Sequence, residues 1–454
     1  MRGLRAAALA ALLAASPPGG LQAESVDLTP EAAILLAQRA YLGGNPSLAH
    51  AIAFRLHEAG VDDPRLPLLL SATTTALGQP DEGRRWGARA WAAARGEPAA
   101  LRHEIARHTA AAAFRAGELT RAQLWLRRAA DTAPDAAARA ATLQDFRAVR
   151  QQNPFSAQLR LAVTPSDNLN SGAGDGALMV DEYYIGEQTG MALALEGLRS
   201  SADLRLQWRL PPDAGGQTSF DARLYGAFYS LTEDSKAETG VASGAALNNT
   251  MAEIGVTRAL PLQGRALTFA ATAGQSWDSG LPVGPHLRLS TRLPFGPETA
   301  GLAAGLSAER QWRDDGPTTA LQFSLSASHD AAGLGRLGWS LALRDVQADF
   351  VNNSYRSATA EISLEAARPL GPVRLGASAF VGLRDYPDYR LGHITVTDGR
   401  EDERFGLSVD MTFEQIGVMG YAPSLSISSE RALSNISRFD TRSLEIGFGI
   451  VTMF

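Results

Sequence analysis

The side chains best suited to chemistry are arginines and carboxylates within short alternating runs after residue 155. Because side chains alternate between the two faces of a strand, these charges share a face with serine, glutamine and glycine, opposite apolar residues. The arginines are Arg160, Arg205, Arg209, Arg223, Arg288, Arg292, Arg344, Arg374 and Arg404. The acids are Asp221, Glu361, Glu365, Asp410, Glu414 and Glu445.

If this charged face lines a lumen, two interpretations stay open. The lumen is either a mixed-charge interior that partly pairs with itself, or a polar path along which a polypeptide moves. The presence of both signs argues against an ion channel whose selectivity comes from charged rings of one sign.

The seven histidines do not form a catalytic or metal-binding pattern. His103 and His108 are five residues apart, whereas metal-binding pairs on one helix favour a spacing of four. His50 and His57 could share a helix face, but no carboxylate pattern accompanies them, so we expect them to be solvated. His329 lies at a strand end, without the serine or activated water that a hydrolase needs.

Cofactor sites are equally hard to find. No glycine-rich loop joins a strand to a helix as a phosphate-binding motif would require. The sequence has no cysteine, which excludes disulfides, cysteine–metal sites and a lipidated N-terminal cysteine. We therefore expect no cofactor, no metal and no enzymatic activity.

The elements that position the charged face are predicted to be strands. Alternation is clearest in residues 321–328, 337–344, 373–380 and 405–413, and fourteen such segments fit into residues 155–454. That leaves about 21 residues per strand and connection, which suits membrane strands of roughly 9–11 residues. A water-soluble β-sandwich would also alternate, but it would not need the terminal signals described below.

The lengths of the connections support a membrane barrel. Every second connection is short and rich in proline or glycine: 211–216, 261–264, 294–297, 330–335, 369–372 and 415–420. Three of the others are long: 164–189, 233–248 and 385–402. Short periplasmic turns and longer outer loops are typical of outer-membrane barrels. The strand half, residues 153–454, is therefore predicted to be a 14-stranded antiparallel transmembrane β-barrel.

Both ends of the chain indicate a bacterial outer-membrane protein. Arg2 and Arg5 precede an apolar run and a small-residue site, which predicts a signal peptide over residues 1–23. The last strand places Phe448 and Phe454 on one face, and a terminal phenylalanine looks like the signal that the barrel-assembly machinery reads during insertion. No apolar stretch reaches the roughly 18 residues that a spanning helix needs.

Overall composition is compatible with this assignment. The hydrophobic fraction is 45%, and the mean hydropathy of −0.10 is superficially that of a soluble protein. Transmembrane barrels share this property because their apolar and polar residues alternate. The net charge of −6 argues against nucleic-acid binding.

Residues 24–152 form a different half, rich in alanine, leucine and arginine with helical spacing. Small residues at Ala110, Gly117, Ala122 and Ala129, followed by Pro134, have the spacing of a tetratricopeptide repeat (TPR). Weaker copies of this pattern are Ala37, Gly44, Ala49 and Gly78, Gly83, Ala90. A helix over residues 135–151 would cap the stack. The alternative is a generic alanine-rich bundle; repeats of this kind usually bind segments of other proteins.

The junction of the two halves resembles the surface lipoprotein assembly modulator (Slam) family. Asn153 and Pro154 precede an aromatic residue, and Pro165, Asn168 and Asn170 form a P-x-x-N-x-N element after the first strand. The resemblance extends over the whole architecture, from signal peptide through short helical repeats to the barrel. For the two asparagines a simpler interpretation is turn chemistry, since asparagine tolerates left-handed backbone and caps its own turn.

The resemblance implies a type XI secretion translocator of the outer membrane. Such a protein would deliver a client lipoprotein, or a secreted haem- or metal-binding protein, to the cell surface or beyond. Its periplasmic repeats would engage the client or a periplasmic chaperone, and its barrel would contact outer-membrane lipid. The alternatives are a polysaccharide export porin with TPR repeats, a general diffusion porin, and a receptor or adhesin.

Overall fold

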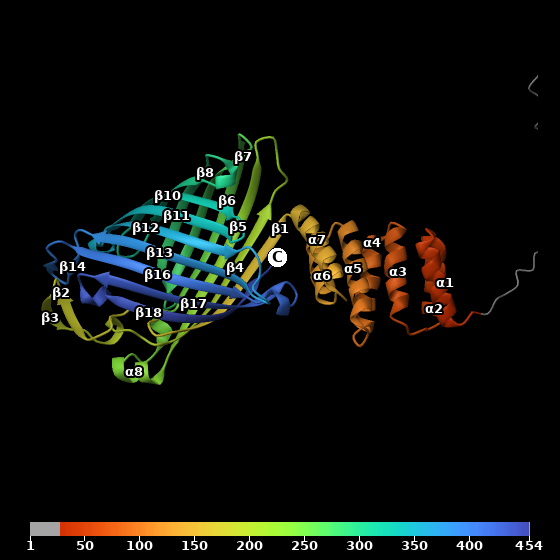
Figure 1. Cartoon of the computed structure of the whole chain (residues 1–454), viewed down its shortest axis with the longest axis horizontal. Helices are drawn as coiled ribbons and strands as arrows, with labels where there is room; N and C mark the ends of the chain where they lie inside the picture. The colour runs from red at the N-terminus through yellow and green to blue at the C-terminus, as the bar shows by residue number, and fades with distance from the viewer. Residues whose placement is uncertain (1–27, 454) are drawn as a thin grey trace, which may run out of the picture. The chain divides into compact units, whose positions relative to one another are not determined.

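The computed structural model describes residues 28–453 (Figure 1), which form two compact units that divide between Glu118 and Leu119. We call residues 28–118 the helical unit and residues 119–453 the barrel unit. The predicted signal peptide, residues 1–23, and the terminal Phe454 lie outside the described residues.

Within residues 28–453, seven helices precede the first strand. The helical unit holds α1 (Pro30–Leu42), α2 (Pro46–Glu58), α3 (Arg65–Ala76), α4 (Pro80–Ala93) and α5 (Ala99–Arg115). The barrel unit begins with α6 (Leu119–Asp131) and α7 (Ala136–Gln152). The cap helix predicted over residues 135–151 is thus α7, and the Asp135 carboxylate accepts a hydrogen bond from Ala138 N at its start, as an N-cap does.

The predicted TPR-like repeats are confirmed. Gly44, Gly78 and Gly117, which hold the same place in each repeat, follow α1, α3 and α5 with φ of 80°, 84° and 76°. Only glycine adopts this left-handed conformation without steric cost, so it ends one helix and lets the next return. The alanines of the pattern, such as Ala37 and Ala49, are fully buried where helices touch.

The core of the helical unit is built from larger side chains around those alanines. Ile34, Leu66, Leu70 and Trp86 pack together in one buried cluster, and Leu68 and Ile105 belong to a second. Burial of these residues, rather than intrinsic helix propensity, supplies most of the stability of short helices.

Fourteen strands close into one antiparallel barrel, in the order β1-β18-β17-β16-β13-β12-β11-β10-β9-β8-β7-β6-β5-β4. The predicted fourteen-stranded fold is therefore confirmed. The strands are β1 (Phe155–Ser166), β4 (Gly197–Arg209), β5 (Gln217–Leu231), β6 (Asn249–Leu262), β7 (Arg265–Asp278), β8 (Leu281–Pro294), β9 (Ala303–Gln311), β10 (Thr318–Ala331), β11 (Gly335–Ala348), β12 (Tyr355–Ala366), β13 (Arg374–Tyr386), β16 (Arg400–Thr412), β17 (Tyr421–Ser434) and β18 (Thr441–Thr452).

The long connections all lie at one end of the barrel, which also carries short ones such as residues 279–280 between β7 and β8. The six connections at the opposite, proximal end, where β1 begins and β18 ends, run from 210–216 to 413–420 and are all short. The distal end carries 167–196 with β2 (Ala177–Val180) and β3 (Tyr183–Glu187), 232–248 with α8 (Glu233–Thr239), and 387–399 with β14 (Arg390–Leu391) and β15 (Ile394–Thr395).

Two long connections have other bounds than the sequence predicted: the first spans 167–196 instead of 164–189, and 385–402 shortens to 387–399. Thr164 lies inside β1, and Asp385 and Asp402 lie inside β13 and β16, because the cross-strand ladders include these residues.

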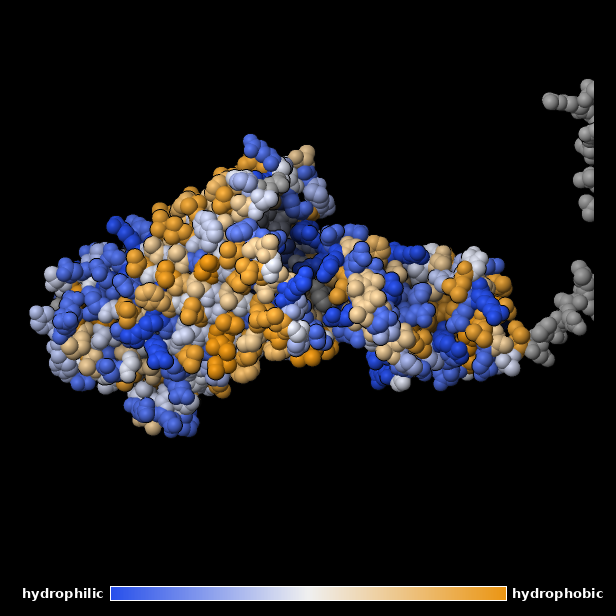
Figure 2. Space-filling model, in the orientation of Figure 1, coloured by the Kyte–Doolittle hydropathy of each residue, from blue (hydrophilic) through white to orange (hydrophobic). Residues whose placement is uncertain are grey.

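The outer face of the barrel is apolar. Leu224, Leu289 and Leu407 point outward, and Figure 2 shows hydrophobic residues gathered over the strands and hydrophilic ones at the distal end. Phe155, Trp208 and Phe220 are neighbours in register near the proximal end, as in the aromatic girdles of outer-membrane barrels. Separately, no helix in residues 28–453 combines the length and apolar character needed to cross a membrane.

Candidate functional site

The lumen carries the predicted charged residues. On β4 the outward Leu198 and Trp208 alternate with Arg199, Asp203, Arg205 and Arg209, so the arginines face inward. Cross-strand register then places the inward residues of neighbouring strands beside each other, for example Arg205 beside Arg223. This arrangement gives an apolar exterior and a polar interior, as in transmembrane barrels.

On the wall formed by β4 to β9, lumenal charges pair with each other. Asp203 contacts Arg205 at 3.0 Å and Arg223 at 2.9 Å. Arg288 contacts Glu309 at 2.7 Å. These contacts, within β4 and between strands, correspond to the self-paired interior, and they reduce the number of free charges that a passing chain would meet.

One pair on this wall is almost fully buried. His286 Nε2 lies 2.9 Å from Glu253 Oε1, with side-chain exposures of 6% and 8%. Arg288 approaches the same carboxylate at 3.7 Å. Asp221 accepts hydrogen bonds from Gln207 at 2.9 Å and Thr257 at 3.0 Å and forms no ion pair within residues 28–453.

The opposite wall is different. Ser326, Ser340 and Ser378 line a lumenal cavity of about 500 Å³ together with three acids, and Arg292 borders it from β8 on the first wall. The acids are Glu361, Glu365 and Asp410. Among residues 28–453 these three acids take part in no ion pair. Arg292 and Arg344 reach only the neutral Ser326 and Gln322, each at 3.5 Å. Of the residues predicted to line a path, Arg292, Arg344 and these three acids therefore have no ion-pair partner among residues 28–453.

Arg160 lies between the two walls on β1, opposite Asp203 and Val451 in register. Further toward the distal end, Arg199 on β4 reaches across β1 to Glu445 on β18 at 2.8 Å. Glu445, a predicted lumenal acid, is thus paired.

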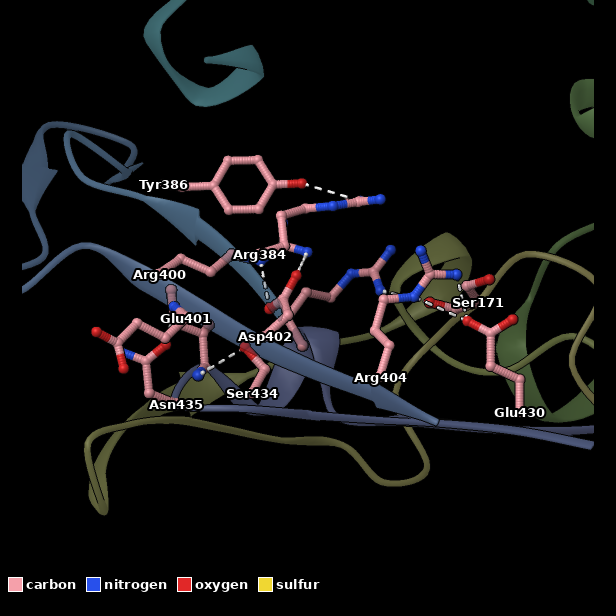
Figure 3. Close-up of polar contacts among 12 residues, drawn as sticks. Ser171, Arg384, Tyr386, Arg400, Glu401, Asp402, Arg404, Glu430, Ser434 and Asn435 are labelled. Atoms are coloured by element: carbon pink, nitrogen blue, oxygen red, sulfur yellow. Dashed lines mark hydrogen bonds and ion pairs between the residues drawn. The ribbon is translucent and has the colours of Figure 1, made fainter. Parts of the chain in front are cut away.

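Loops at the distal mouth form a small core of their own. Tyr386, Tyr389, Val396 and Ile436 are buried together. The Arg400 guanidinium lies over the rings of Tyr386 and Phe439, at 4.4 and 3.2 Å from their centroids. It also contacts Asp402 at 2.6 Å. In Figure 3, Arg384 points toward Tyr386 and Arg404 toward Glu430 in the same region.

This distal core ties together three connections that are far apart in the sequence. Residues 177–181 bond to residues 435–437: Met179 N donates to Ser437 Oγ at 2.8 Å, and Asp181 N donates to Asn435 O at 3.0 Å. Burial raises the pKa of Tyr389 in the third connection. The mouth is therefore bordered by packed rather than free loops.

At the proximal end, Arg209 binds the end of α7 instead of lining a path through the lumen. Its guanidinium donates to the carbonyls of Arg150, Gln151 and Asn153 at 3.1, 3.3 and 2.6 Å. A cation there satisfies carbonyls that the end of α7 leaves unpaired and complements the helix dipole. Arg374, also near this end, pairs with Glu414 at 2.6 Å.

The junction motif is a structural joint. Asn153 is buried, and its side-chain amide nitrogen donates to Thr120 and Gln123, each at 3.1 Å, while its side-chain Oδ1 accepts from Phe155 N. Pro154 O accepts from Arg209 N at 2.8 Å. Both residues thus help to attach the α6–α7 hairpin to the barrel.

The two asparagines after β1 organise the first distal connection. The buried Asn168 exchanges bonds with Gly172 and donates to Arg442 O on β18 at 2.9 Å. Asn170 bonds to Met191, Leu193 and Leu195. Pro165 lies within β1. The asparagines therefore stabilise loop structure, and Asn168 also joins the first strand's loop to the last strand.

Other residues named from the sequence are Phe448 on β18 and three histidines of the helical unit, His50, His57 and His108. Phe448 points outward from β18 and is exposed. His50 bonds to Thr73 at 3.2 Å and His57 packs edge-on against Trp86, so His50 is less solvated than expected. Burial lowers the pKa of His108. No group of three or more metal-ligating side chains is placed to hold a metal within residues 28–453.

Sequence reasoning missed Asp203, Glu253, Glu309 and the Arg400–Asp402 pair. Asp203 was detectable, since it lies two residues before Arg205 on the same strand and therefore on the same face. The burial of Glu253 with His286 was not, because the two residues come from strands that only the barrel brings together.

The fold and lumen define a β-barrel protein of the outer-membrane type, preceded by TPR-like helices. No protein-family model matches the sequence. No curated protein matches it either.

Some solved structures show a limited likeness. The type III secretion translocator chaperone SycD of Yersinia enterocolitica is 20% identical over 28% of this chain and 88% of its own, with a TM-score of 0.25. A bacterial polysaccharide outer membrane secretin is 11% identical over 66% and 98%, with a TM-score of 0.33. OprB of Pseudomonas putida is 9% identical over 68% and 96%, with a TM-score of 0.38. At such TM-scores the likenesses carry no argument about function.

Proposed function

We propose that this chain is a non-enzymatic protein translocator of the outer membrane, of the kind that the Slam family represents. The helical repeats would face the periplasm and engage a client lipoprotein, a secreted haem- or metal-binding protein, or a chaperone that carries one. The barrel would then deliver the client to the surface. Insertion would depend on the barrel-assembly machinery reading the C-terminal segment of the sequence with Phe448 and Phe454.

One observation carries the proposal: helical repeats and a charge-lined membrane barrel occur in a single chain. Repeats of this kind bind extended or helical segments of other proteins. A general diffusion porin would leave the repeats without a role. In the lumen, charges of both signs on a serine-rich wall offer a polypeptide polar contacts without one dominant sign.

The test is a comparison of surface proteomes in the source bacterium with and without the gene. Loss of one or two specific surface or secreted proteins, restored by the full chain, is the expected result. A second complementing chain lacks residues 28–118, and a heat-shift assay verifies that its barrel has inserted. It should fail to restore the client.

The rival functions predict other outcomes. An unchanged surface proteome with altered polysaccharide export would favour an export porin. Unchanged proteins with altered uptake of small sugars, restored equally by both complementing chains, would favour a diffusion porin.

A further inference from the structure

The barrel is joined least firmly where its first and last strands meet. Within residues 28–453, β1 and β18 share five residue pairs in register, from Arg160–Val451 to Ser166–Glu445. Other neighbouring strands share more, and the next shortest ladders, β8–β9 and β9–β10, have nine each. The β1–β18 ladder is also interrupted between Val163 and Ser166, where Pro165 has no N–H to donate. We call this boundary the seam.

Side chains complete the seam at both ends. At the proximal end, the Thr452 hydroxyl bonds to both Leu159 N and Leu159 O at 3.2 Å. At the distal end, Asp167 accepts from Leu444 N at 2.7 Å and Asn168 donates to Arg442 O at 2.9 Å. These groups can release without unzipping a long backbone ladder.

The α6–α7 hairpin bridges the seam at the proximal end. On one side, Arg209 of β4 holds the end of α7. On the other, Met419 N in the β16–β17 turn donates to Asp131 of α6 at 2.7 Å, and Arg127 lies 5.5 Å from the Tyr421 ring centroid. Since β1 and β18 lie between β4 and β17, the hairpin reaches across both seam strands.

A groove on the outer wall adjoins the seam. It has a volume of about 470 Å³ and lies between Phe228 on β5 and Phe448 on β18. Small side chains at Ser200 and Ala202 leave this space open on β4. The wall is thus thinner beside its shortest ladder.

We propose that the seam opens sideways and that the α6–α7 hairpin controls the opening. Unpaired strand edges are costly in hydrocarbon, so an open seam needs an occupant. An extended polypeptide segment fits this need, because its backbone can pair with the freed edges of β1 and β18 as an added strand. The seam then gives a client a route between lumen and lipid, and this use rests on the function proposed above.

Hydrogen exchange on the full chain in lipid nanodiscs tests the opening. Amides of β1 and β18 at their shared edge should exchange at least tenfold faster than amides shared by β10 and β11. Asp131→Ala should accelerate seam exchange further and leave β10 and β11 unchanged. Asp131→Asn keeps an acceptor for Met419 N and should behave like the native chain.

Two results would overturn the mechanism. Equal exchange at the seam and at β10–β11 would show that the seam does not open. An unchanged hydrogen-exchange rate at the seam in Asp131→Ala would show that the α6–α7 hairpin does not control the opening.

A disulfide tests the route. Because the chain has no cysteine, Leu161→Cys with Ile450→Cys creates the only thiol pair, on residues in register across the seam. The matched control is Leu325→Cys with Leu341→Cys, an outward pair between β10 and β11. Oxidation should reduce client surface delivery about tenfold in the seam variant alone, and reductant should restore it.

Full delivery with a locked seam would overturn the lateral route but leave the translocator intact. A native chain that delivers no client would instead refute the proposed function, while the exchange rates would still decide whether the seam opens.

Discussion

The helical unit and the barrel place the same residue types in opposite positions. In the helical unit Ile34, Leu66 and Leu70 are buried at the centre. In the barrel Leu224, Leu289 and Leu407 point outward and the charges lie inside. Apolar residues leave water in both cases, but the helical unit must hide them within itself, whereas the barrel offers them to lipid. The difference shows that each half is built for a different solvent.

Polar groups in the helical unit and in the barrel also find their hydrogen-bond and ion-pair partners in different ways. In α3, the hydroxyls of Thr73, Thr74 and Thr75 donate to carbonyls four residues earlier, at 2.7, 2.5 and 2.6 Å. In the barrel, polar groups find partners across strands, as Asp203 does with Arg223. Local bonds form with the helix itself, while lumenal pairs exist only once the barrel closes.

The largest expected effect tests burial in the helical unit. Leu70→Ala removes a side chain that is 0% exposed and should cost about 2–5 kcal/mol. Leu77→Ala, at a position 42% exposed, should change stability by less than about 0.5 kcal/mol. Urea unfolding of the full chain, followed by far-ultraviolet circular dichroism, measures both. Equal costs would contradict the assignment of the core.

The second test concerns the outer face of the barrel. Leu224→Arg, at the centre of β5 and 53% exposed, should destabilise the barrel in lipid vesicles by about 2–4 kcal/mol. Leu77→Arg on the helical unit should have almost no effect. If both arginines were tolerated equally in a vesicle-folding titration, the outer face would not contact hydrocarbon.

The third test concerns Asn168, which joins the connection after β1 to β18. Asn168→Ala leaves the buried polar groups of Gly172 and Arg442 without their partner, and should cost about 1–3 kcal/mol. Limited proteolysis of residues 167–196 in micelles should become faster. Asn170→Ala should loosen the same loop without weakening its bond to β18. Indistinguishable cleavage of both variants and the native chain would show that neither asparagine holds the loop.

The smallest effect concerns pH. Burial lowers the pKa of His108 below its ordinary value of 6.5, so the unfolded chain binds the proton more tightly. Helical-unit stability should therefore fall as pH drops through about 6.5 toward the folded-state pKa. Hydrogen exchange in α5 at pH 7.5 and 5.5, corrected for intrinsic rates, measures this loss. His108→Gln should flatten the dependence; a native chain without any loss would contradict the assigned cause.

Much of the architecture was predictable because each half has a local period. Alternation located β10, β11, β13 and β16, and the repeated glycines located the helix turns. Strand ends were less predictable: Asp385 and Asp402 belong to the cross-strand ladder of β13 and β16. Alternation predicted which strand face carries the lumenal residues. It could not predict that Arg209 holds the end of α7.

The sequence by itself determined the two solvents, the fourteen strands and the charged inner face, because periodicity depends only on neighbouring residues. The tertiary structure alone decided which charges pair, which stay free and where the barrel closes weakly. Glu253 meets His286 from 33 positions away, and Asn168 meets Arg442 from 274. Such partners depend on the stagger of the closed barrel, which no local pattern encodes.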